Sequence, residues 1–460
     1  MLKTSFHLDP VDTHDLPRRF LDAFAAVLEH SNYGPALDAA NRLLAKCGRC
    51  SVTCPIYQAG DLTRDNPCHR SELLLQVYRR YFTPKGALLG TFGGGFELTT
   101  EHINTIAEEY YRCTACKRCR MDCPMGIDHA MITHLGRWIL AETGIIPKAL
   151  RAAVRAQLEG DAHNTSAVPA PAMMDTCEFL ADECAEDRGI KIEFPFDKQG
   201  AEYIFFPAVS DFLLEPDTLM GNAAVLGAGK IDWTIGTKYF DGINYGLFYS
   251  DRMHENIINQ EFNELERLGV KKIMIGECGH ASRAARHFVD TFWVGRKSSP
   301  PEVAACVDVA YKLFKNGDIK LRENVIEGRI TYHDPCNIAR SGWVVEQPRE
   351  LLKHICKDYV DMTPKGTLNY CCGGGSGLVS IDEIREYRTG LNGKTKAQQI
   401  ADTKANIVVA PCANCKKQLK EVCEDNKLGD VKVIGLHDLL LQALVVPKHM
   451  LAGDDAADGE

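Results

Sequence analysis

Hydrophobic residues recur at helical spacing in the first third of the chain. The stretches FLDAFAAVLEH (20–30) and ALDAANRLLAK (36–46) show this spacing, and a further helical stretch covers 134–160. An amphipathic helix is expected to begin close to Cys68, in NPCHRSELLLQVYRRYF. These patterns predict a helical N-terminal domain.

From about residue 190, short apolar runs alternate with amphipathic segments. The runs IKIEF (190–194) and YIFFPA (203–208) predict strands, and IINQEFNELERLG (257–269) predicts a helix that leads to the strand KKIMIG (271–276). A second cycle follows in ITYHDPC (330–336), ANIVVAP (405–411) and VKVIGLHDLLLQAL (431–444). Alternation of this kind predicts α/β architecture.

The predicted fold class is α+β multidomain, with a helical domain followed by a duplicated α/β domain. Residues 160–174 are polar and rich in Pro and Ala, which is typical of a linker, and the last ten residues are acidic and expected to be disordered. The predicted boundaries are 1–160 for the helical domain, 161–190 for the linker, 191–325 and 326–447 for the two α/β copies, and 448–460 for the acidic tail.

The two α/β copies differ in their cysteines. FFPAVS takes the place of YHDPCN, which sets Ala208 opposite Cys336. IGECGHAS takes the place of APCANCKK, so that Cys278 matches Cys412 and Ala281 stands where the second copy has its next cysteine. GINYGLF, in the place of LNYCCGG, has no cysteine at the paired positions. The first copy is therefore degenerate and is expected to serve as scaffold and as one wall of a pocket between the two halves.

Composition narrows the class of protein. The chain has 460 residues, which is enough for two to four domains, and 19 cysteines. We find neither a secretory signal nor an apolar run of about 18 residues, so a reducing compartment is expected, with cysteines as metal ligands or redox groups. The net charge of -9 argues against nucleic-acid binding.

One cysteine run has the spacing of bacterial ferredoxins. CTACKRCRMDCP follows the pattern C-x2-C-x2-C-x3-C-P in full, with Cys113, Cys116, Cys119 and Cys123 as its cysteines. Three thiolates of such a run hold one cubane [4Fe-4S] cluster, and the fourth usually serves the second cubane of a two-cluster protein.

A second, incomplete run precedes it. Cys47, Cys50 and Cys54 fit the last three positions, Leu44 stands at the first, and Cys68 can supply the missing sulfur. A crossed assignment places Cys47, Cys50, Cys68 and Cys123 around one cubane and Cys54, Cys113, Cys116 and Cys119 around the other. A local assignment, in which each run closes on its own cluster, uses the same eight residues. A pair of zinc knuckles is the structural alternative.

Five cysteines in three pieces lie between residues 331 and 416. They are Cys336, the adjacent pair Cys371 and Cys372, and Cys412 with Cys415. Adjacent thiolates strain a zinc site but can serve different metals of an iron–sulfur cluster. Gly373, Gly374 and Gly375 follow the pair and let backbone amides approach sulfide or a ligand. Five unconnected core thiols are the alternative.

This three-part pattern resembles the CCG domain of the heterodisulfide reductase superfamily. The resemblance implies that the five cysteines bind a noncubane [4Fe-4S] cluster. The whole arrangement resembles the heterodisulfide reductase D-like subunits of the DsrK, TmcB and HmcF type, from respiratory membrane complexes of sulfate reducers.

The same resemblance implies an activity and partners. Electrons are expected to pass from a membrane quinone pool or cytochrome, through an integral membrane subunit, to a cytoplasmic disulfide or trisulfide carried by a small protein such as DsrC. The chain is then expected to be peripheral on the inner face of the cytoplasmic membrane, attached through partner subunits.

Cys278 and His280 survive in the degenerate copy, and two interpretations compete. They are relics in a tight turn, or they face the intact cluster, where a thiol can be a ligand or thiol partner and an imidazole can pass a proton. Their place after the strand 271–276 favours the second interpretation. His333 and Arg340 are weaker candidates, for which strand-end packing and a surface salt bridge are expected.

Two other functions stay open. In one, the chain is an iron–sulfur relay subunit of a quinone-linked dehydrogenase for glycerol 3-phosphate, glycolate or lactate. In the other, it is an assembly subunit whose clusters are structural.

The glycine-rich stretch 91–97 lacks the order of a phosphate loop and predicts a turn. Since the chain has no dinucleotide or flavin fingerprint, electrons are expected to arrive from another polypeptide.

Overall fold

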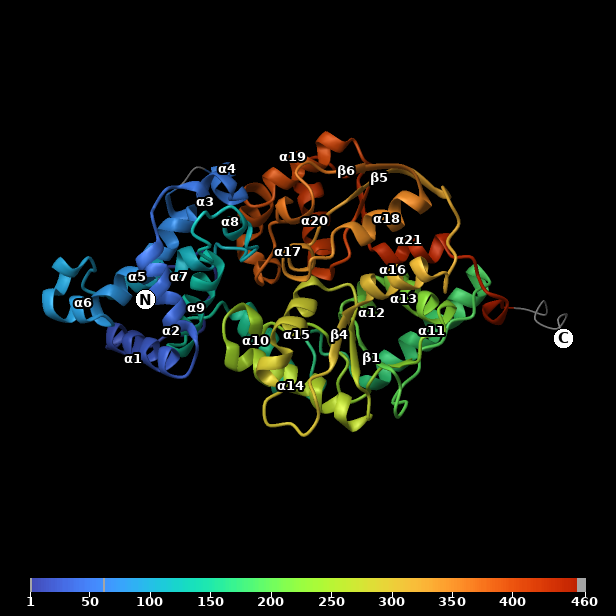
Figure 1. The fold of residues 1–460 in the computed structure, drawn as a ribbon, viewed down its shortest axis with the longest axis horizontal. Helices are drawn as coiled ribbons and strands as arrows, with labels where there is room; N and C mark the ends of the chain where they lie inside the picture. Colours follow the sequence, from blue (N-terminus) through green and yellow to red (C-terminus); the bar gives the residue numbers. More distant parts are fainter. Residues whose placement is uncertain (1, 61–62, 453–460) are drawn as a thin grey trace. The chain divides into compact units, whose positions relative to one another are not determined.

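The computed structural model describes residues 2–60 and 63–452, and its contacts divide the chain into two compact units. The first unit comprises Met1–Ala152, Tyr245–Met253 and Tyr370–Ala397, and the second comprises Ala153–Asn244, His254–Asn369 and Gln398–Glu460. Figure 1 shows the elements of both units, coloured along the sequence.

The first unit is helical, as the spacing of apolar residues predicts. Its helices are α1 (Leu16–Glu29), α2 (Tyr33–Leu43), α3 (Arg49–Thr53), α4 (Pro55–Gly60), α5 (Pro67–Tyr81), α6 (Pro84–Leu89), α7 (Thr100–Tyr110), α8 (Arg118–Met121) and α9 (His129–Glu142), with the 3₁₀ helices η1 (Thr63–Asp65) and η2 (Gly90–Gly93). In α1 the apolar positions form one buried stripe, which packs on α9. The helix α5 begins where the sequence indicates, because Asn66 accepts hydrogen bonds from the N–H groups of Cys68 and His69 and Pro67 occupies the first turn.

Later parts of the chain complete this unit. They carry the short turns η3 (Gly246–Phe248), η5 (Leu378–Ser380), η6 (Asp382–Ile384) and η7 (Tyr387–Leu391). Three helices begin in the first unit and continue into the second, namely α10 (Lys148–Leu158), α14 (Asp251–Arg267) and α19 (Lys394–Thr403).

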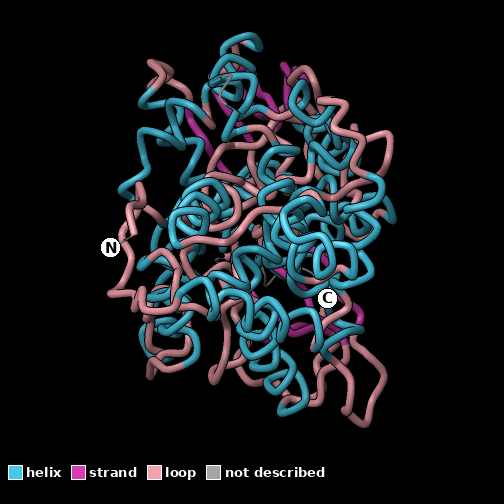
Figure 2. The backbone as a smooth tube through the Cα atoms, turned by 90° about the vertical axis from the view of Figure 1, so that its left-hand side faces the viewer, coloured by secondary structure: helices cyan, strands magenta, loops and turns pink. Residues whose placement is uncertain are grey.

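The second unit contains two parallel four-stranded sheets. The first has the order β2-β1-β3-β4 and the second the order β6-β5-β7-β8, so the two halves share one topology. The strands are β1 (Tyr203–Phe206), β2 (Trp233–Thr234), β3 (Lys272–Ile275), β4 (Glu302–Ala305), β5 (Ile326–Tyr332), β6 (Cys356–Asp361), β7 (Ile407–Val409) and β8 (Lys432–Ile434). Identical strand order confirms the predicted duplication and the α/β texture. Figure 2 shows that helices make up much more of the backbone than strands do.

Helices join the two halves of this unit. They are α12 (Asp211–Leu214), α13 (Pro216–Ala228), α15 (Gly279–Phe292) and α16 (Cys306–Asn316) in the first half, and α17 (Cys336–Gly342), α18 (Glu346–Ile355), α20 (Ala413–Asp425) and α21 (Leu436–Ala443) in the second. The helix α13 packs on α21, and α15 packs on α17. A Cβ atom on Gly221 would lie 2.2 Å from the carbonyl oxygen of His437, so glycine permits the close approach of α13 to α21.

Three local expectations meet different structure. The stretch 190–194 is not a strand, because Ile190 makes only an isolated bridge to Leu451 and the segment has no ladder partner among the described residues. The expected linker 161–190 contains the helix α11 (Ala170–Arg188), whose buried side chains include Cys177 and Cys184. The 3₁₀ helix η8 (Lys448–Met450) precedes the ten residues that were expected to be disordered. Of these ten, Leu451 forms the bridge to Ile190, and the prediction for 453–460 lies outside the described residues.

Candidate iron–sulfur centres

The incomplete ferredoxin run lies around the start of α5. Cys50, near the start of α3, and Cys68, in the first turn of α5, share a hydrogen bond between their sulfur atoms. This bond and burial raise the pKa of Cys50 to about 12, and the same bond lowers the pKa of Cys68. His129 also hydrogen-bonds to Cys50, and its Nδ1 lies 2.7 Å from Ser71 Oγ. The structure thus brings Cys68 to the run that lacks one cysteine.

Cys54 belongs to a different group of thiols. It lies within electrostatic range of Cys113 and Cys116, and Cys119 in turn lies within range of Cys54, Cys113 and Cys116. Burial raises the pKa of Cys54 to about 11 and that of Cys119 further above its ordinary value. These four thiols are those that the crossed assignment places around one cubane.

A buried arginine near these four cysteines bears on whether they fit an iron–sulfur cluster. Arg70 is 2% exposed, its charge lowers the pKa of Cys54, and its Nε has no hydrogen-bond partner among residues 2–60 and 63–452. Its Nη1 donates to the carbonyl oxygen of Arg64 over 3.5 Å, so the guanidinium is satisfied in part, and a buried cation with an unsatisfied N–H group is costly. An anionic group held by Cys54 and Cys113 would compensate its charge, which fits a thiolate-bound iron–sulfur cluster.

The loop with the adjacent cysteine pair belongs to the same unit as these thiols. Cys371 and Cys372 are buried, and the N–H of Gly373 donates to Cys371 Sγ over 3.5 Å. Gly373 has a φ of 105°, a conformation that favours glycine. A Cβ on Gly375 would lie 2.6 Å from the carbonyl oxygen of Thr114, so only glycine allows this approach to the ferredoxin run.

Arg137 connects the cysteine-pair loop to that run. This fully buried guanidinium donates through Nη2 to the carbonyl oxygen of Cys113 over 2.7 Å and through Nη1 to Ser376 Oγ over 2.6 Å. A second contact between the two segments is made by Arg118, whose guanidinium lies over the ring of Tyr370 at 4.5 Å. The pair is therefore held at a fixed distance from the cysteines of the ferredoxin run.

In the second unit, two equivalent turns meet. Cys278 follows β3 and precedes α15, whereas Cys412 follows β7 and precedes α20, and each cysteine occupies the N-cap position of its helix without a capping hydrogen bond from its side chain. In both turns the cysteine N–H donates to the carbonyl oxygen two residues earlier, over 2.6 Å for Cys278 and 2.7 Å for Cys412. The N–H of Ala413 donates to the carbonyl oxygen of Glu277 over 2.7 Å and links the two turns.

The thiols of these turns are in contact. Cys412 accepts hydrogen bonds from Cys278 and Cys415, which hold its pKa well below the ordinary value, while burial raises the pKa of Cys278. A Cβ on Gly279 would lie 3.5 Å from both Cys412 Sγ and Pro335 Cβ, so the turn before Cys336 lies at the same place. Of the two interpretations of Cys278, this geometry favours the one in which it faces the intact cysteine set.

His280 lies beside this thiol contact. Its Nδ1 is 3.3 Å from Cys278 Sγ and 3.3 Å from Asn414 Nδ2, and burial lowers its pKa to about 4. The imidazole is therefore neutral near pH 7. With Nδ1 facing the amide donor, the proton of the neutral ring is assigned to Nε2.

Two protein-family models match the segments that contain these cysteines. Residues 45–127 match the 4Fe-4S dicluster domain, and residues 330–420 match the CCG cysteine-rich domain. An Archaeoglobus fulgidus protein, "Hdr-like menaquinol oxidoreductase iron-sulfur subunit 2", is 27% identical over 95% of this chain and 86% of its own length.

A Methanosarcina barkeri protein, one of the subunits of a dihydromethanophenazine:CoB–CoM heterodisulfide reductase, is 26% identical over 87% of this chain and 93% of its own length. The chain is homologous to heterodisulfide reductase-like iron–sulfur subunits. A Syntrophomonas wolfei EtfAB:quinone oxidoreductase is also similar, at 22% identity over 84% of this chain and 56% of the relative. These similarities support an oxidoreductase that carries iron–sulfur clusters.

The structure places several residues where the sequence does not indicate them. Arg340, expected in a surface salt bridge, is buried and donates to the carbonyl oxygens of Thr367, over 2.7 Å, and Asn369. It thereby fixes the segment before Cys371 to α17, the helix that begins with Cys336. His333 is fully buried at the end of β5, as strand-end packing predicts.

A network of buried charged side chains adjoins the two turns. Glu277 Oε1 is 2.7 Å from His437 Nδ1, and Lys416 Nζ donates to Thr218 Oγ1 over 2.8 Å. Asp211 lies 3.6 Å from Lys416, and burial raises its pKa to about 7. Sequence reasoning missed these residues because each comes from a separate helix or turn.

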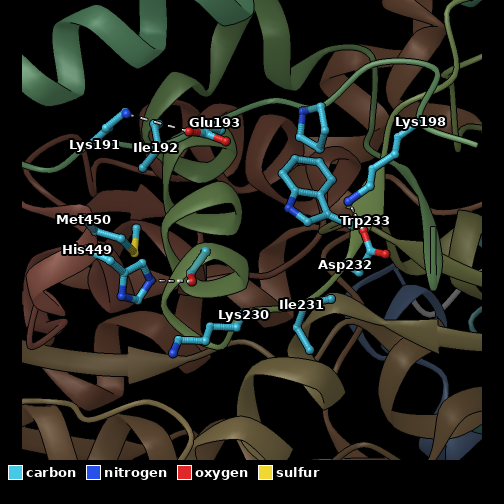
Figure 3. A pocket seen from close by; sticks show the side chains of 12 residues that line it. Lys191, Ile192, Glu193, Lys198, Lys230, Ile231, Asp232, Trp233, His449 and Met450 are labelled. Atoms are coloured by element: carbon cyan, nitrogen blue, oxygen red, sulfur yellow. Dashed lines mark hydrogen bonds and ion pairs between the residues drawn. The ribbon is translucent and has the colours of Figure 1, made fainter.

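A cavity of about 370 Å³ in this unit lies apart from the cysteines (Figure 3). Its wall includes Asp232 and Trp233 at the start of β2, hence at the amino end of a parallel sheet, whereas the cysteine turns follow the carboxyl ends. Lys198 pairs with Asp232 over 2.6 Å, and Lys191 lies 3.9 Å from Glu193. Paired surface charges give this cavity no chemistry that relates to the clusters.

Proposed function

We propose that the chain is the electron-transferring and catalytic subunit of a membrane-associated respiratory complex that reduces a disulfide or trisulfide. Menaquinol, named for the Archaeoglobus fulgidus relative, is the proposed source of electrons, delivered through an integral membrane subunit. The acceptor is a small protein of the DsrC type on the cytoplasmic side of the membrane.

The ligands follow from the two motifs. Cys47, Cys50, Cys68 and Cys123 are proposed to hold one cubane, and Cys54, Cys113, Cys116 and Cys119 the other. Cys336, Cys371, Cys372, Cys412 and Cys415 are proposed to hold the noncubane cluster. When bound, the clusters supply one-electron transfer and an iron atom that can bind sulfur.

The observation that carries the proposal is the attachment of the cysteine pair to the ferredoxin run. Arg137 hydrogen-bonds to both segments, and Gly375 permits their backbones to approach closely. Electron transfer needs a short, fixed separation between centres. A subunit with merely structural clusters would not require this rigid link.

The turn residues of the degenerate copy are proposed to serve the sulfur chemistry. Splitting a disulfide consumes two electrons and two protons and gives two thiols. Cys278 donates a hydrogen bond to Cys412, and the Nε2–H of neutral His280 is the proposed route by which a proton reaches a released thiolate. Since His280 has a pKa of about 4, it passes protons as a neutral ring and does not store them.

The test replaces one residue of the pair. Cys371→Ser is expected to abolish reduction of a disulfide or trisulfide, with both cubane signals retained in low-temperature electron paramagnetic resonance (EPR). Cys177→Ser, at a buried thiol in α11, is the matched control and is expected to change neither. Unchanged turnover in Cys371→Ser would contradict the proposed role of the pair.

A relay function is the second candidate, since the Syntrophomonas wolfei relative is named as a quinone oxidoreductase. A paramagnetic signal that appears when oxidised substrate is added indicates sulfur binding at the cluster. Its absence, together with quinone-linked oxidation of a hydroxy acid by the complex, favours the relay. An iron content below about eight per chain, against about twelve for three four-iron clusters, favours structural clusters.

A further inference from the structure

A short hairpin of the first unit exposes large apolar side chains. It comprises α6 and η2, which follow α5 (α6 in Figure 1). Leu88 is 84% exposed, Leu89 is 45% exposed and Phe92 is 92% exposed, and we call these three residues the apolar tip. From Tyr81 to Phe96 the sequence holds one charged residue, Lys85, in a chain whose net charge is -9.

The hairpin is fastened to α5 by specific contacts. Arg79 Nε donates to the carbonyl oxygen of Gly94 over 2.8 Å, and Arg80 pairs with Glu97 over 2.7 Å. A Cβ on Gly86 would lie 1.8 Å from the carbonyl oxygen of Arg79, so glycine lets α6 pack directly on α5. These contacts hold the backbone of the apolar tip in place. Polar side chains at these positions would avoid exposing apolar surface, so the exposed leucines and phenylalanine require an explanation.

We propose that the apolar tip inserts into the interfacial region of a lipid bilayer. Three side chains offer too little area for a separate protein interface, which usually takes about 20 to 30 residues from each partner. Leucine and phenylalanine beside a lysine are typical of segments that enter the headgroup region. In the described part of the chain Lys85 forms no ion pair with an acidic side chain, so its charge is available to anionic lipids.

This inference rests on the proposed function in one respect, namely that the electron donor is membrane-bound. The apolar tip lies in the unit that carries both ferredoxin runs, so insertion would hold the site where electrons arrive at the membrane. One small apolar anchor gives weak, reversible attachment, and stable attachment requires a second contact such as a partner subunit.

The test measures flotation of the full-length, cluster-loaded protein with lipid vesicles. The wild type is expected to float with mixed phosphatidylcholine and phosphatidylglycerol vesicles, and Leu88→Ser/Phe92→Ser is expected to bind at least about tenfold more weakly. Lys85→Gln is expected to weaken binding to the mixed vesicles but not to pure phosphatidylcholine. Phe179→Ser, which removes a 64% exposed phenylalanine from α11, is the matched control and is expected to bind normally.

Cubane EPR signals establish that each variant is folded and loaded. Disulfide reduction with a soluble reductant shows separately whether the proposed activity exists, so failure of either idea can be recognised. Absence of flotation by the wild type, or equal loss in Phe179→Ser, would overturn lipid insertion. If the wild type does not float but Leu88→Ser/Phe92→Ser no longer copurifies with a membrane subunit, the apolar tip binds protein and lipid insertion is wrong.

Discussion

The buried Arg70 supports the interpretation of the two ferredoxin runs as ligands of a negatively charged cluster. On the sequence it is one of several cations of an amphipathic helix, for which a solvent-exposed position is the ordinary expectation. In the structure it is buried, and its charge lowers the pKa of Cys54. Cysteine spacing can predict ligands, but the charge that compensates a cluster depends on tertiary packing, which no local pattern encodes.

Cys68→Ala tests the replacement of the sulfur missing at Leu44. Because Cys68 shares a hydrogen bond with Cys50 at the incomplete run, its loss is expected to remove one cubane and about four irons per chain. Low-temperature EPR and iron analysis measure both effects. Cys184→Ala, at a buried thiol of α11, should retain both cubanes. Two intact cubane signals in Cys68→Ala would show that another group supplies the fourth ligand.

Asp211→Asn tests the buried charge network by its pH dependence. Burial raises the pKa of Asp211 from 3.8 to about 7 in the folded protein. Between these values the unfolded chain loses the proton while the folded protein retains it, so the stability that this group contributes falls as pH rises. The slope reaches about 1.4 kcal/mol per pH unit for one proton.

Thermal unfolding of both proteins at several pH values measures this effect. The variant has no proton to lose at this position, so the wild type should lose stability relative to it from about pH 4 to about pH 7. Above that window the difference should level off. A difference that does not depend on pH would mean that Lys416 keeps Asp211 ionised in the folded protein.

At the scale of elements, periodicity predicted the central strands and the edge strand β8, but not the edge strands β2, β4 and β6. The runs around β1, β3, β5 and β7 are apolar and buried, and each was expected. The edge strand β2 has only two residues, and β4 begins at an exposed glutamate, so neither gives a clear apolar pattern. The run 190–194 has strand character, but among residues 2–60 and 63–452 it makes only the isolated bridge from Ile190 to Leu451, which sequence pattern alone cannot reveal.

Gly375→Ala tests the close approach of the cysteine-pair loop to the ferredoxin run. The new Cβ would lie 2.6 Å from the carbonyl oxygen of Thr114, and backbone must shift to relieve the clash. Overpacking of this kind is expected to cost about 1–3 kcal/mol and to slow electron transfer to the pair. Freeze-quench EPR after rapid reduction of the cubanes measures the transfer.

Gly390→Ala is the matched control for that change. It lies in η7 of the same unit, and a Cβ there would meet nothing within 4 Å. We expect this variant to transfer electrons normally and to be no less stable. If Gly375→Ala behaves as Gly390→Ala does, close contact between the two segments is not needed for the electron path.

At the scale of the molecule, compact units and sequence modules divide the chain differently. The sequence places 326–447 in one α/β copy, whereas the contacts assign Tyr370–Ala397 to the helical unit. The reason is visible in Arg137 and Gly375, which attach the cysteine-pair loop to the ferredoxin run. Sequence order records the duplication, but a loop that leaves its own fold to join another unit is specified by a few long-range contacts.

This division predicts how the chain responds to loss of iron. The helices α3 and α8, which carry the proposed cluster ligands Cys50 and Cys119, have five and four residues. Helices of this length are not stable alone, so they should depend on the clusters for their order. The strands β1, β3, β5 and β7 each pair with a neighbour on both sides and do not need iron for their hydrogen bonds.

Hydrogen exchange after anaerobic chelation of iron distinguishes these responses. Amides of 49–53 and 118–121 are expected to exchange at least about tenfold faster, while those of the central strands keep their protection. Protein that is taken through the same steps without chelator provides the reference. Uniform loss of protection would mean that the two units unfold together, and unchanged exchange in α3 and α8 would mean that the cysteine runs fold without metal.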